Sequence, residues 1–215
     1  MTKRKRQRKH PRKDPRSPEM AAPREQRDSV TRLPRSARLT LLAVAVALIL
    51  LADDRHVGMV ADGRQMINTA VAIAETGEIG LARGTDFTLP RPRGDAVSRF
   101  GMGTSLLQMP AAWLAPRVEA VRGPGSSQFL FLLVPLIGVL VTAWAAAKSV
   151  LLLGAPAAAA APAVLLASIA SPLGSYAAMV FSEPVQSAVL GLGFAAALAS
   201  ARSEGRRATR LAVAA

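Results

Sequence analysis

The chain has 215 residues, of which 51% are hydrophobic, and a formal net charge of +13. It contains no cysteine, which excludes disulfide bonds and thiolate metal sites, and its two histidines are too few to favour a zinc site built on imidazoles. The basic charge is concentrated, because residues 1–38 hold 14 Lys or Arg against 4 Asp or Glu. The charge therefore belongs to a tail and not to a basic folded domain.

Residues 1–36 form this tail, which is rich in Lys, Arg and Pro and offers almost no apolar surface to bury. We expect it to be disordered and cytoplasmic. Clusters of Lys and Arg also bind nucleic acids, but the tail has no aromatic residue for base stacking and leads directly into an apolar segment. Its expected partners are therefore anionic lipid headgroups, with nucleic acid as the weaker alternative.

Charge-free apolar segments follow the tail and predict an all-α, polytopic membrane helix bundle. A helix needs roughly 20 apolar residues to cross a bilayer. The four predicted transmembrane helices are residues 37–52, 128–147, 151–170 and 185–201. The first of them is short, although Arg38 can lengthen it by reaching the interface, and a signal peptide is the alternative interpretation.

The stretch between the first two predicted spans, residues 53–127, contains eight acidic and eight basic side chains and is too polar for hydrocarbon. We expect it to be an extracytoplasmic loop. Apolar residues recur near helical spacing over residues 63–75 and 105–114, and Trp113 suits the headgroup level. Both stretches are therefore predicted to be short interfacial helices.

The orientation follows from the rule that short cytoplasmic loops collect Lys and Arg. The tail, Lys148 and the arginines of residues 202–215 mark the cytoplasmic side. Residues 171–184 then form a second extracytoplasmic loop, and we expect a multi-pass protein of the plasma membrane. Residues 211–215 look like the start of another apolar segment, so we also expect a truncated or partial protein.

The candidate catalytic residues are two acids, Asp62 after the first span and Glu183 at the start of the fourth. A carboxylate at the outer face can activate a hydroxyl acceptor or hold a divalent cation that binds phosphate. Each acid also has a simpler interpretation, because Asp62 can cap the helix that follows it and Glu183 can favour a helix start. Gly101 and Gly103 form an isolated GxG, which lacks the context of a dinucleotide site.

Three sequence motifs follow the first span in order: ADGRQMINTAVAIAETGEIGL, VSRFGMGTSLLQMPAAWL and SPLGSYAAMVFSEPVQSAVLGLGFAAAL. Together they resemble the amino-terminal part of bacterial GT-C glycosyltransferases, which are membrane enzymes related to protein mannosyltransferases and aminoarabinose transferases. Those enzymes have an acid and a helix of the type D-G-x-x-M/Y in the first outer loop, then a Y-S-R/K-Y/F-G-x-G segment, then F-S-E-P in a later outer loop. The resemblance covers about residues 60–201.

The resemblance implies a polyprenyl-phosphate sugar as donor and transfer of the sugar to an acceptor hydroxyl at the outer membrane face. Asp62 would be the general base or the acid that orients the acceptor, and Glu183 would be the acid of the second loop. Arg99 would face the donor phosphate. The other substrate-binding residues are Phe100, Gly101, Gly103 and Tyr176, the last of which is also expected as an interfacial belt residue.

The sequence departs from the family at a position where paired acids could bind a metal ion. Many relatives carry an adjacent acidic pair in the first loop, whereas here Gly63 follows Asp62. The sequence thus predicts no fixed metal site and leaves a divalent cation open as a cofactor. The alternative function is a non-catalytic polytopic membrane protein, a transporter fragment or an assembly factor, in which the acids only cap helices. An enzyme needs Asp62 and Glu183 at one cavity, whereas a scaffold has no such need.

Overall fold

A computed structural model describes residues 32–52, 61–81, 88–90, 96–98, 102–177 and 179–214. This part of the chain is mostly helical, which confirms the helical class predicted from sequence. Two short strands, β1 (Thr88–Pro90) and β2 (Ala96–Ser98), pair antiparallel. The helices are α2 (Arg35–Leu51), α3 (Ala61–Thr76), α4 (Met102–Arg122), α5 (Gln128–Leu152), α6 (Ala160–Ser168), α7 (Leu173–Ala177) and α8 (Glu183–Ala214).

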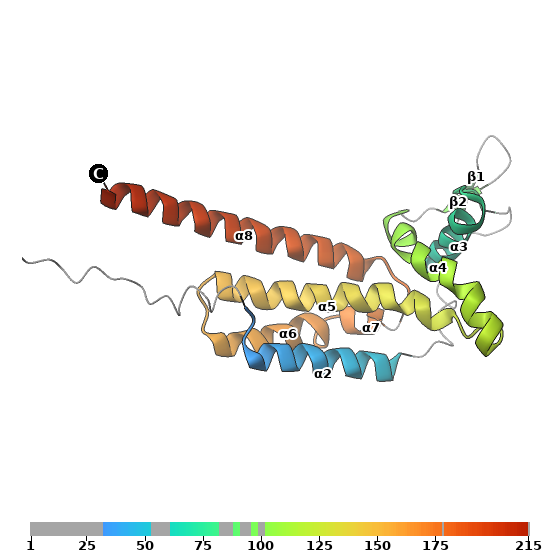
Figure 1. The fold of residues 1–215 in the computed structure, drawn as a ribbon, viewed down its shortest axis with the longest axis horizontal. Helices are drawn as coiled ribbons and strands as arrows, with labels where there is room; N and C mark the ends of the chain where they lie inside the picture. The colour runs from blue at the N-terminus through green and yellow to red at the C-terminus, as the bar shows by residue number, and fades with distance from the viewer. Residues whose placement is uncertain are drawn as a thin grey trace, which may run out of the picture.

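Helices α2, α5, α6, α7 and α8 form a bundle (Figure 1). At one end of it lies a cap, which consists of α3, α4 and the two strands. Helix α5 lies at the centre of the bundle and contacts α2, α6, α7 and α8. The bundle core includes Val44 of α2, Val139 and Ala143 of α5, and Ala160 and Val164 of α6. The alanines among them let the helix backbones approach closely.

Large apolar side chains point away from this core. Two helical segments, Gln128–Leu152 and Glu183–Ser203, are long and apolar enough to cross a membrane. Many large apolar side chains on the outer faces of the bundle are exposed, an arrangement typical of helices that are packed in lipid. The exposed large side chains include Leu42, Val46 and Leu50 of α2, Ile137 and Trp144 of α5, Leu165 and Leu166 of α6, and Val189, Leu190 and Phe194 of α8.

The prediction of a continuous third span over residues 151–170 was wrong. Leu151 and Leu152 belong to α5, and the chain then turns at Gly154, whose φ is +93°. Helical structure resumes only over Ala157–Ser168 and is roughly 18 Å long at 1.5 Å per residue, too short for a hydrocarbon core of about 30 Å. Pro156 explains the break, because proline disfavours helix in the residue before it.

The third apolar segment instead has two parts, α6 and α7, which follow one another along α5 (Figure 1). The joint between them is tight, because a Cβ atom at Gly174 would lie 2.6 Å from the carbonyl oxygen of Ser168. Ser171 Oγ donates a hydrogen bond to the carbonyl oxygen of Ala167 at 2.9 Å. A broken helix is tolerated in an apolar setting when such local bonds satisfy the backbone.

The predicted helices of the first loop lie within α3 and α4, which pack on each other and on the start of α5. Helix α4 continues well beyond the predicted 105–114 and contains Pro110 and Pro116. The turn from α4 to α5 is closed by Glu119, whose Oε1 accepts hydrogen bonds from Ser127 Oγ at 2.6 Å and from the Gly125 amide at 3.3 Å. These bonds set the cap against the bundle. Residues 1–31 of the predicted tail lie outside the described residues.

Candidate functional site

Asp62 lies in the first turn of α3 and is partly buried. A carboxylate at this end of a helix is favoured by the helix dipole. Among the described residues, the structure gives the carboxylate of Asp62 no hydrogen-bond or ion-pair partner. The carboxylate of Asp62 therefore lies at the start of α3 without a hydrogen bond to another described residue.

Gly63, the next residue, packs directly against the second predicted loop. A Cβ atom at Gly63 would lie 2.5 Å from the carbonyl oxygen of Val180 and 3.0 Å from its Cβ. Side chains essentially never approach backbone so closely, so only glycine fits here. Val180 is fully buried. The segment that carries Asp62 and the segment that leads to Glu183 are thus in van der Waals contact.

Glu183 is the first residue of α8 and is exposed. The next residue, Pro184, is buried against α5, where a Cβ atom at Gly138 would lie 2.7 Å from the carbonyl carbon of Pro184. Proline suits the first turn of a helix because its missing N–H has no partner to lose there. Two glycines, Gly63 and Gly138, therefore fix the connection that carries Glu183.

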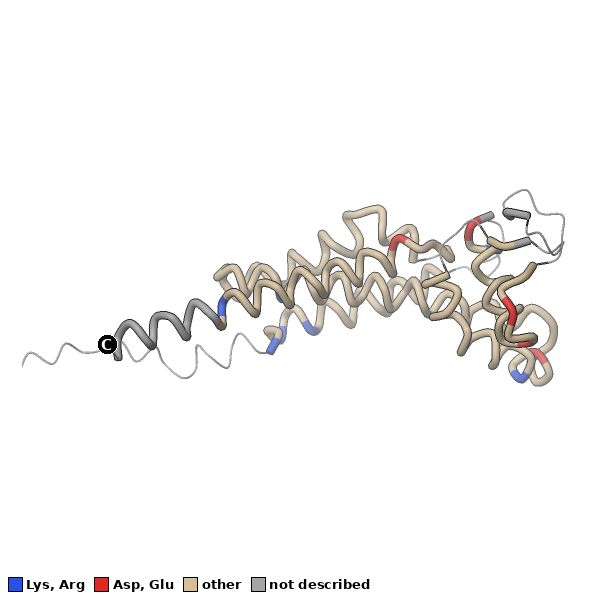
Figure 2. The backbone as a smooth tube through the Cα atoms, turned by 90° about the horizontal axis from the view of Figure 1, so that it is seen from above, with Lys and Arg blue, Asp and Glu red and all other residues tan. Residues whose placement is uncertain are grey.

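The segments that carry Asp62 and Glu183 touch each other, and the contact is made by Gly63 and Val180 and not by the two acids. Chain geometry sets an upper limit of roughly 20 Å between the Cα atoms of Asp62 and Glu183, because the contact between Gly63 and Val180 joins their segments. Figure 2 shows the acidic positions in red toward the end of the molecule that carries α3 and α4. Both carboxylates thus belong to the same end of the bundle.

Tyr176 also belongs to this connection. It lies in α7, and its ring packs against the ring of Phe181 with centroids 4.9 Å apart and planes inclined at 48°. The Met179 amide donates a hydrogen bond to the Tyr176 carbonyl oxygen at 3.2 Å, and the Phe181 amide donates one to the Met179 carbonyl oxygen at 3.0 Å. The aromatic pair therefore braces the turn that ends at Glu183.

The remaining predicted residues divide into two groups. Arg99, Phe100 and Gly101 lie outside the described residues. Gly103 lies in the first turn of α4, where it is exposed and a Cβ atom would meet nothing within 4 Å. Its position therefore does not require glycine, in contrast to Gly63.

A set of buried polar residues on α3 and α4, called here the polar cluster, was not predicted from the sequence. Gln108 is fully buried, and neither polar atom of its side-chain amide has a hydrogen-bond partner among the described residues. Each buried unsatisfied polar group costs about 1–3 kcal/mol. The sequence did contain a sign of this cluster. Gln65 and Thr69 on α3, like Thr104 and Gln108 on α4, are four positions apart and so share one helix face. The cluster comprises Gln65, Thr69, Thr104, Ser105 and Gln108, and Gln65 Oε1 and Thr69 Oγ1 also lack partners.

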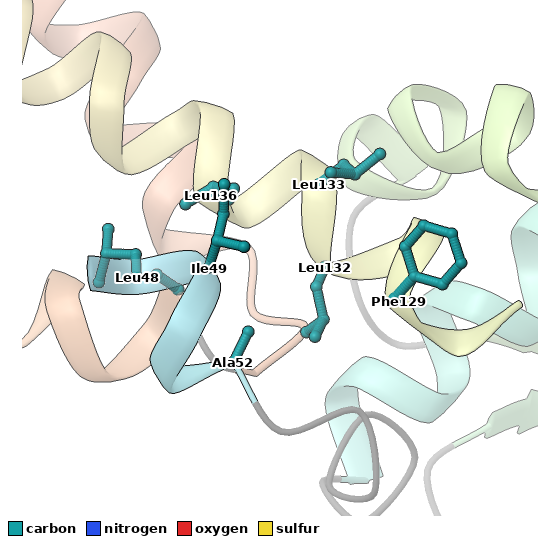
Figure 3. Close-up of a pocket in the computed structure, with 8 residues that line it drawn as sticks. Leu48, Ile49, Ala52, Phe129, Leu132, Leu133 and Leu136 are labelled. Atoms are coloured by element: carbon teal, nitrogen blue, oxygen red, sulfur yellow. The ribbon is translucent and has the colours of Figure 1, made fainter. Parts of the chain in front are cut away.

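Two apolar cavities open beside the acid-bearing end. One, of about 280 Å³, lies between α5 and α8 and begins at Val185, two residues after Glu183. The other, also of about 280 Å³, lies between α2 and α5 (Figure 3). The first is lined by Leu107, Val134, Ile137, Gly138, Val141, Val185, Ala188, Val189 and Leu192. The second is lined by Leu48, Ile49, Ala52, Phe129, Leu132, Leu133, Leu136 and Ala177. Walls of this kind suit hydrocarbon chains.

The described residues contain no group of three or more His, Asp or Glu side chains that could hold a metal ion. The arrangement therefore consists of two carboxylates on adjoining segments, an aromatic brace and apolar cavities beside them. No protein-family model, no curated protein and no solved structure matches the chain.

Proposed function

We propose that this chain is a multi-pass membrane glycosyltransferase of the GT-C type, or the amino-terminal part of one. It transfers a sugar from a polyprenyl-phosphate donor to an acceptor hydroxyl at the extracytoplasmic face of the plasma membrane. The observation that carries the proposal is the contact between Gly63 and Val180, which joins the segments of Asp62 and Glu183. A scaffold whose acids only start helices does not need the two acids on adjoining segments.

The proposed topology has four crossings, with α2, α5, the broken pair α6 and α7, and α8. It is supported by the outward-facing apolar side chains and by the charges at the two bundle ends. Lys148, near the end of α5, stands 5.9 Å from the centroid of the Trp144 ring, a pairing suited to the membrane interface. The arginines at the same end of the bundle support, by the positive-inside rule, the proposal that the amino terminus lies in the cytoplasm.

In the proposed reaction, the acceptor oxygen forms a bond to C1 of the sugar. The bond from C1 to the phosphate oxygen breaks, and polyprenyl phosphate leaves with that electron pair. The carboxylate of Asp62 accepts the proton of the attacking hydroxyl, and Glu183 orients the acceptor by accepting a hydrogen bond from a second polar group of the acceptor. An acid without a hydrogen-bond partner among the described residues is suited to receive such a proton.

The apolar cavity between α5 and α8 supports a lipid-linked donor in particular. Its lining includes Val185, two residues after Glu183, so a chain lying in it could carry its phosphate toward the end of the cavity near Glu183. Its lining is almost wholly aliphatic, with Leu107 of the cap closing one side. An isoprenoid chain has the matching chemistry, because it needs no hydrogen-bond partner.

The test uses membranes from cells that produce the full chain, incubated with radiolabelled polyprenyl-phosphate mannose and, separately, polyprenyl-phosphate aminoarabinose. We expect label to move from the lipid to an acceptor with one of these donors. Asp62→Asn should reduce transfer by a factor of about 10²–10⁴ at unchanged membrane abundance. Glu75→Gln, which alters an exposed acid at the other end of α3, should leave transfer intact. Near-normal transfer by Asp62→Asn would reject the base assignment.

A further inference from the structure

A second cavity with a different chemistry lies at the end of the bundle opposite the cap. It has a volume of about 500 Å³, and four arginines line it: Arg32, Arg35, Arg38 and Arg202. Its other lining residues are apolar or contribute backbone, and none of the described residues that line it is acidic. In Figure 2 a group of blue positions lies at this end of the bundle, and blue also occurs in the cap beside the acidic positions. The cavity therefore brings the side chains of Arg32, Arg35 and Arg38 together with Arg202 of α8.

The start of α2 adds to this charge. Helix α2 begins at Arg35 after Pro34, no side chain caps its first amide groups, and its first turn contains no acid. The first amides of a helix lack partners inside the helix and carry the positive end of its dipole. An anion in the cavity would meet this helix end as well as the arginines.

The walls of the cavity are held by packing and hydrogen bonds. Arg202 of α8 donates hydrogen bonds to the carbonyl oxygens of Leu151 and Leu152 at 3.2 and 2.9 Å, which ties α8 to the end of α5. Leu33 is 7% exposed and belongs to the bundle core, so the segment before α2 is anchored too. The arginines are thus presented by three packed parts of the fold.

We propose that this cavity binds the phosphate headgroup of an anionic phospholipid from the adjoining leaflet. The planar guanidinium group of arginine matches phosphate oxygens with two parallel hydrogen bonds. Below the arginines, Leu39 and Leu42 of α2 are exposed and apolar, which gives the acyl chains a surface to follow. Basic pockets between membrane helices bind phospholipid headgroups by the same chemistry. The inference rests on the membrane placement proposed above and not on sugar transfer.

The experiment titrates the purified full chain in detergent with short-chain phosphatidylglycerol, short-chain phosphatidylcholine and inorganic phosphate, and native mass spectrometry counts the lipid that stays bound. We expect phosphatidylglycerol to bind more tightly than the other two. The double variant Arg35→Gln and Arg38→Gln should weaken that binding by about 25-fold, which is about fivefold for each arginine. Circular dichroism checks that the variant keeps its helices.

The matched control removes the same charge from the tail through Arg12→Gln and Lys13→Gln, and should leave the bound lipid in place. If the double variant fails to fold, Arg32→Gln alone should still weaken binding about fivefold, because Arg32 precedes α2 and is exposed. Equal loss from the tail control would overturn the proposal. So would equal affinity for the two lipids, or inorganic phosphate binding as tightly as phosphatidylglycerol.

Discussion

The carbonyl oxygen of Val180 lies so close to Gly63 that a Cβ atom at the glycine would stand 2.5 Å from it. This contact joins residues that are far apart in the sequence and brings the connection before Glu183 onto the start of α3. Gly138 and Pro184 form a second contact of the same kind on the side of α5. The acid-bearing end of the molecule thus depends on two positions that accept no side chain.

The first prediction concerns Gly63→Ala. The added methyl group would force α3 away from Val180, and such overpacking typically costs about 1–3 kcal/mol in the free energy of unfolding. We expect a lower melting temperature in detergent and, if the proposed enzyme is correct, at least a tenfold loss of sugar transfer. The control is Gly103→Ala, where the space is open and alanine favours a helix by roughly 0.5–1 kcal/mol. An unchanged melting temperature for Gly63→Ala would contradict the contact.

Gly138→Ala tests the second contact in the same manner. Here the methyl group would meet the backbone of Pro184, so α8 must shift away from α5 and carry Glu183 with it. We expect destabilisation of about 1–3 kcal/mol, measured by thermal melting. Gly193→Ala on α8 is the matched control, because a Cβ atom there meets nothing within 4 Å. Equal melting temperatures for the two variants would contradict the close contact between Gly138 and Pro184.

Much of the bundle could be predicted from the sequence because hydrocarbon-length stretches without charge leave few alternatives. Helices α2, α5 and α8 overlap the predicted spans for this reason. The break between α5 and α6 could not be predicted from apolarity, because Gly154 and Pro156 sit in a stretch as free of charge as any span. Chain geometry, and not hydropathy, sets that turn.

The candidate site was predictable only in part. Asp62 and Glu183 were found from their places beside the apolar segments, but the contact that joins their segments depends on tertiary packing between distant residues. Gln108 was not among the predicted site residues, because a polar residue in a predicted interfacial helix gives no sign by itself that it is fully buried. Its burial follows from the face it shares with Thr104, one helical turn earlier.

That burial leads to a prediction about Gln108→Leu. The leucine keeps a similar volume and removes an amide that has no partner, so we expect the free energy of unfolding to stay equal or to rise by about 1–3 kcal/mol. Gln186→Leu is the control, because Gln186 is exposed and its Nε2 already donates to Ser182 Oγ at 3.1 Å. A marked fall in the melting temperature of Gln108→Leu would mean that the buried amide is satisfied after all.

The proposed topology can be mapped with single cysteines, because the chain has none of its own. A maleimide that cannot cross membranes should label Arg122→Cys in intact cells, since Arg122 is exposed at the end of α4. Ala158→Cys and Ser203→Cys should react only after the cells are permeabilised. Ala158 is the decisive position, because it lies just after the turn that follows α5. The sequence predicted a continuous helix there. Labelling of Ala158→Cys in intact cells would put that turn on the outer side, and the arginine-lined cavity beside it would then face the outer leaflet.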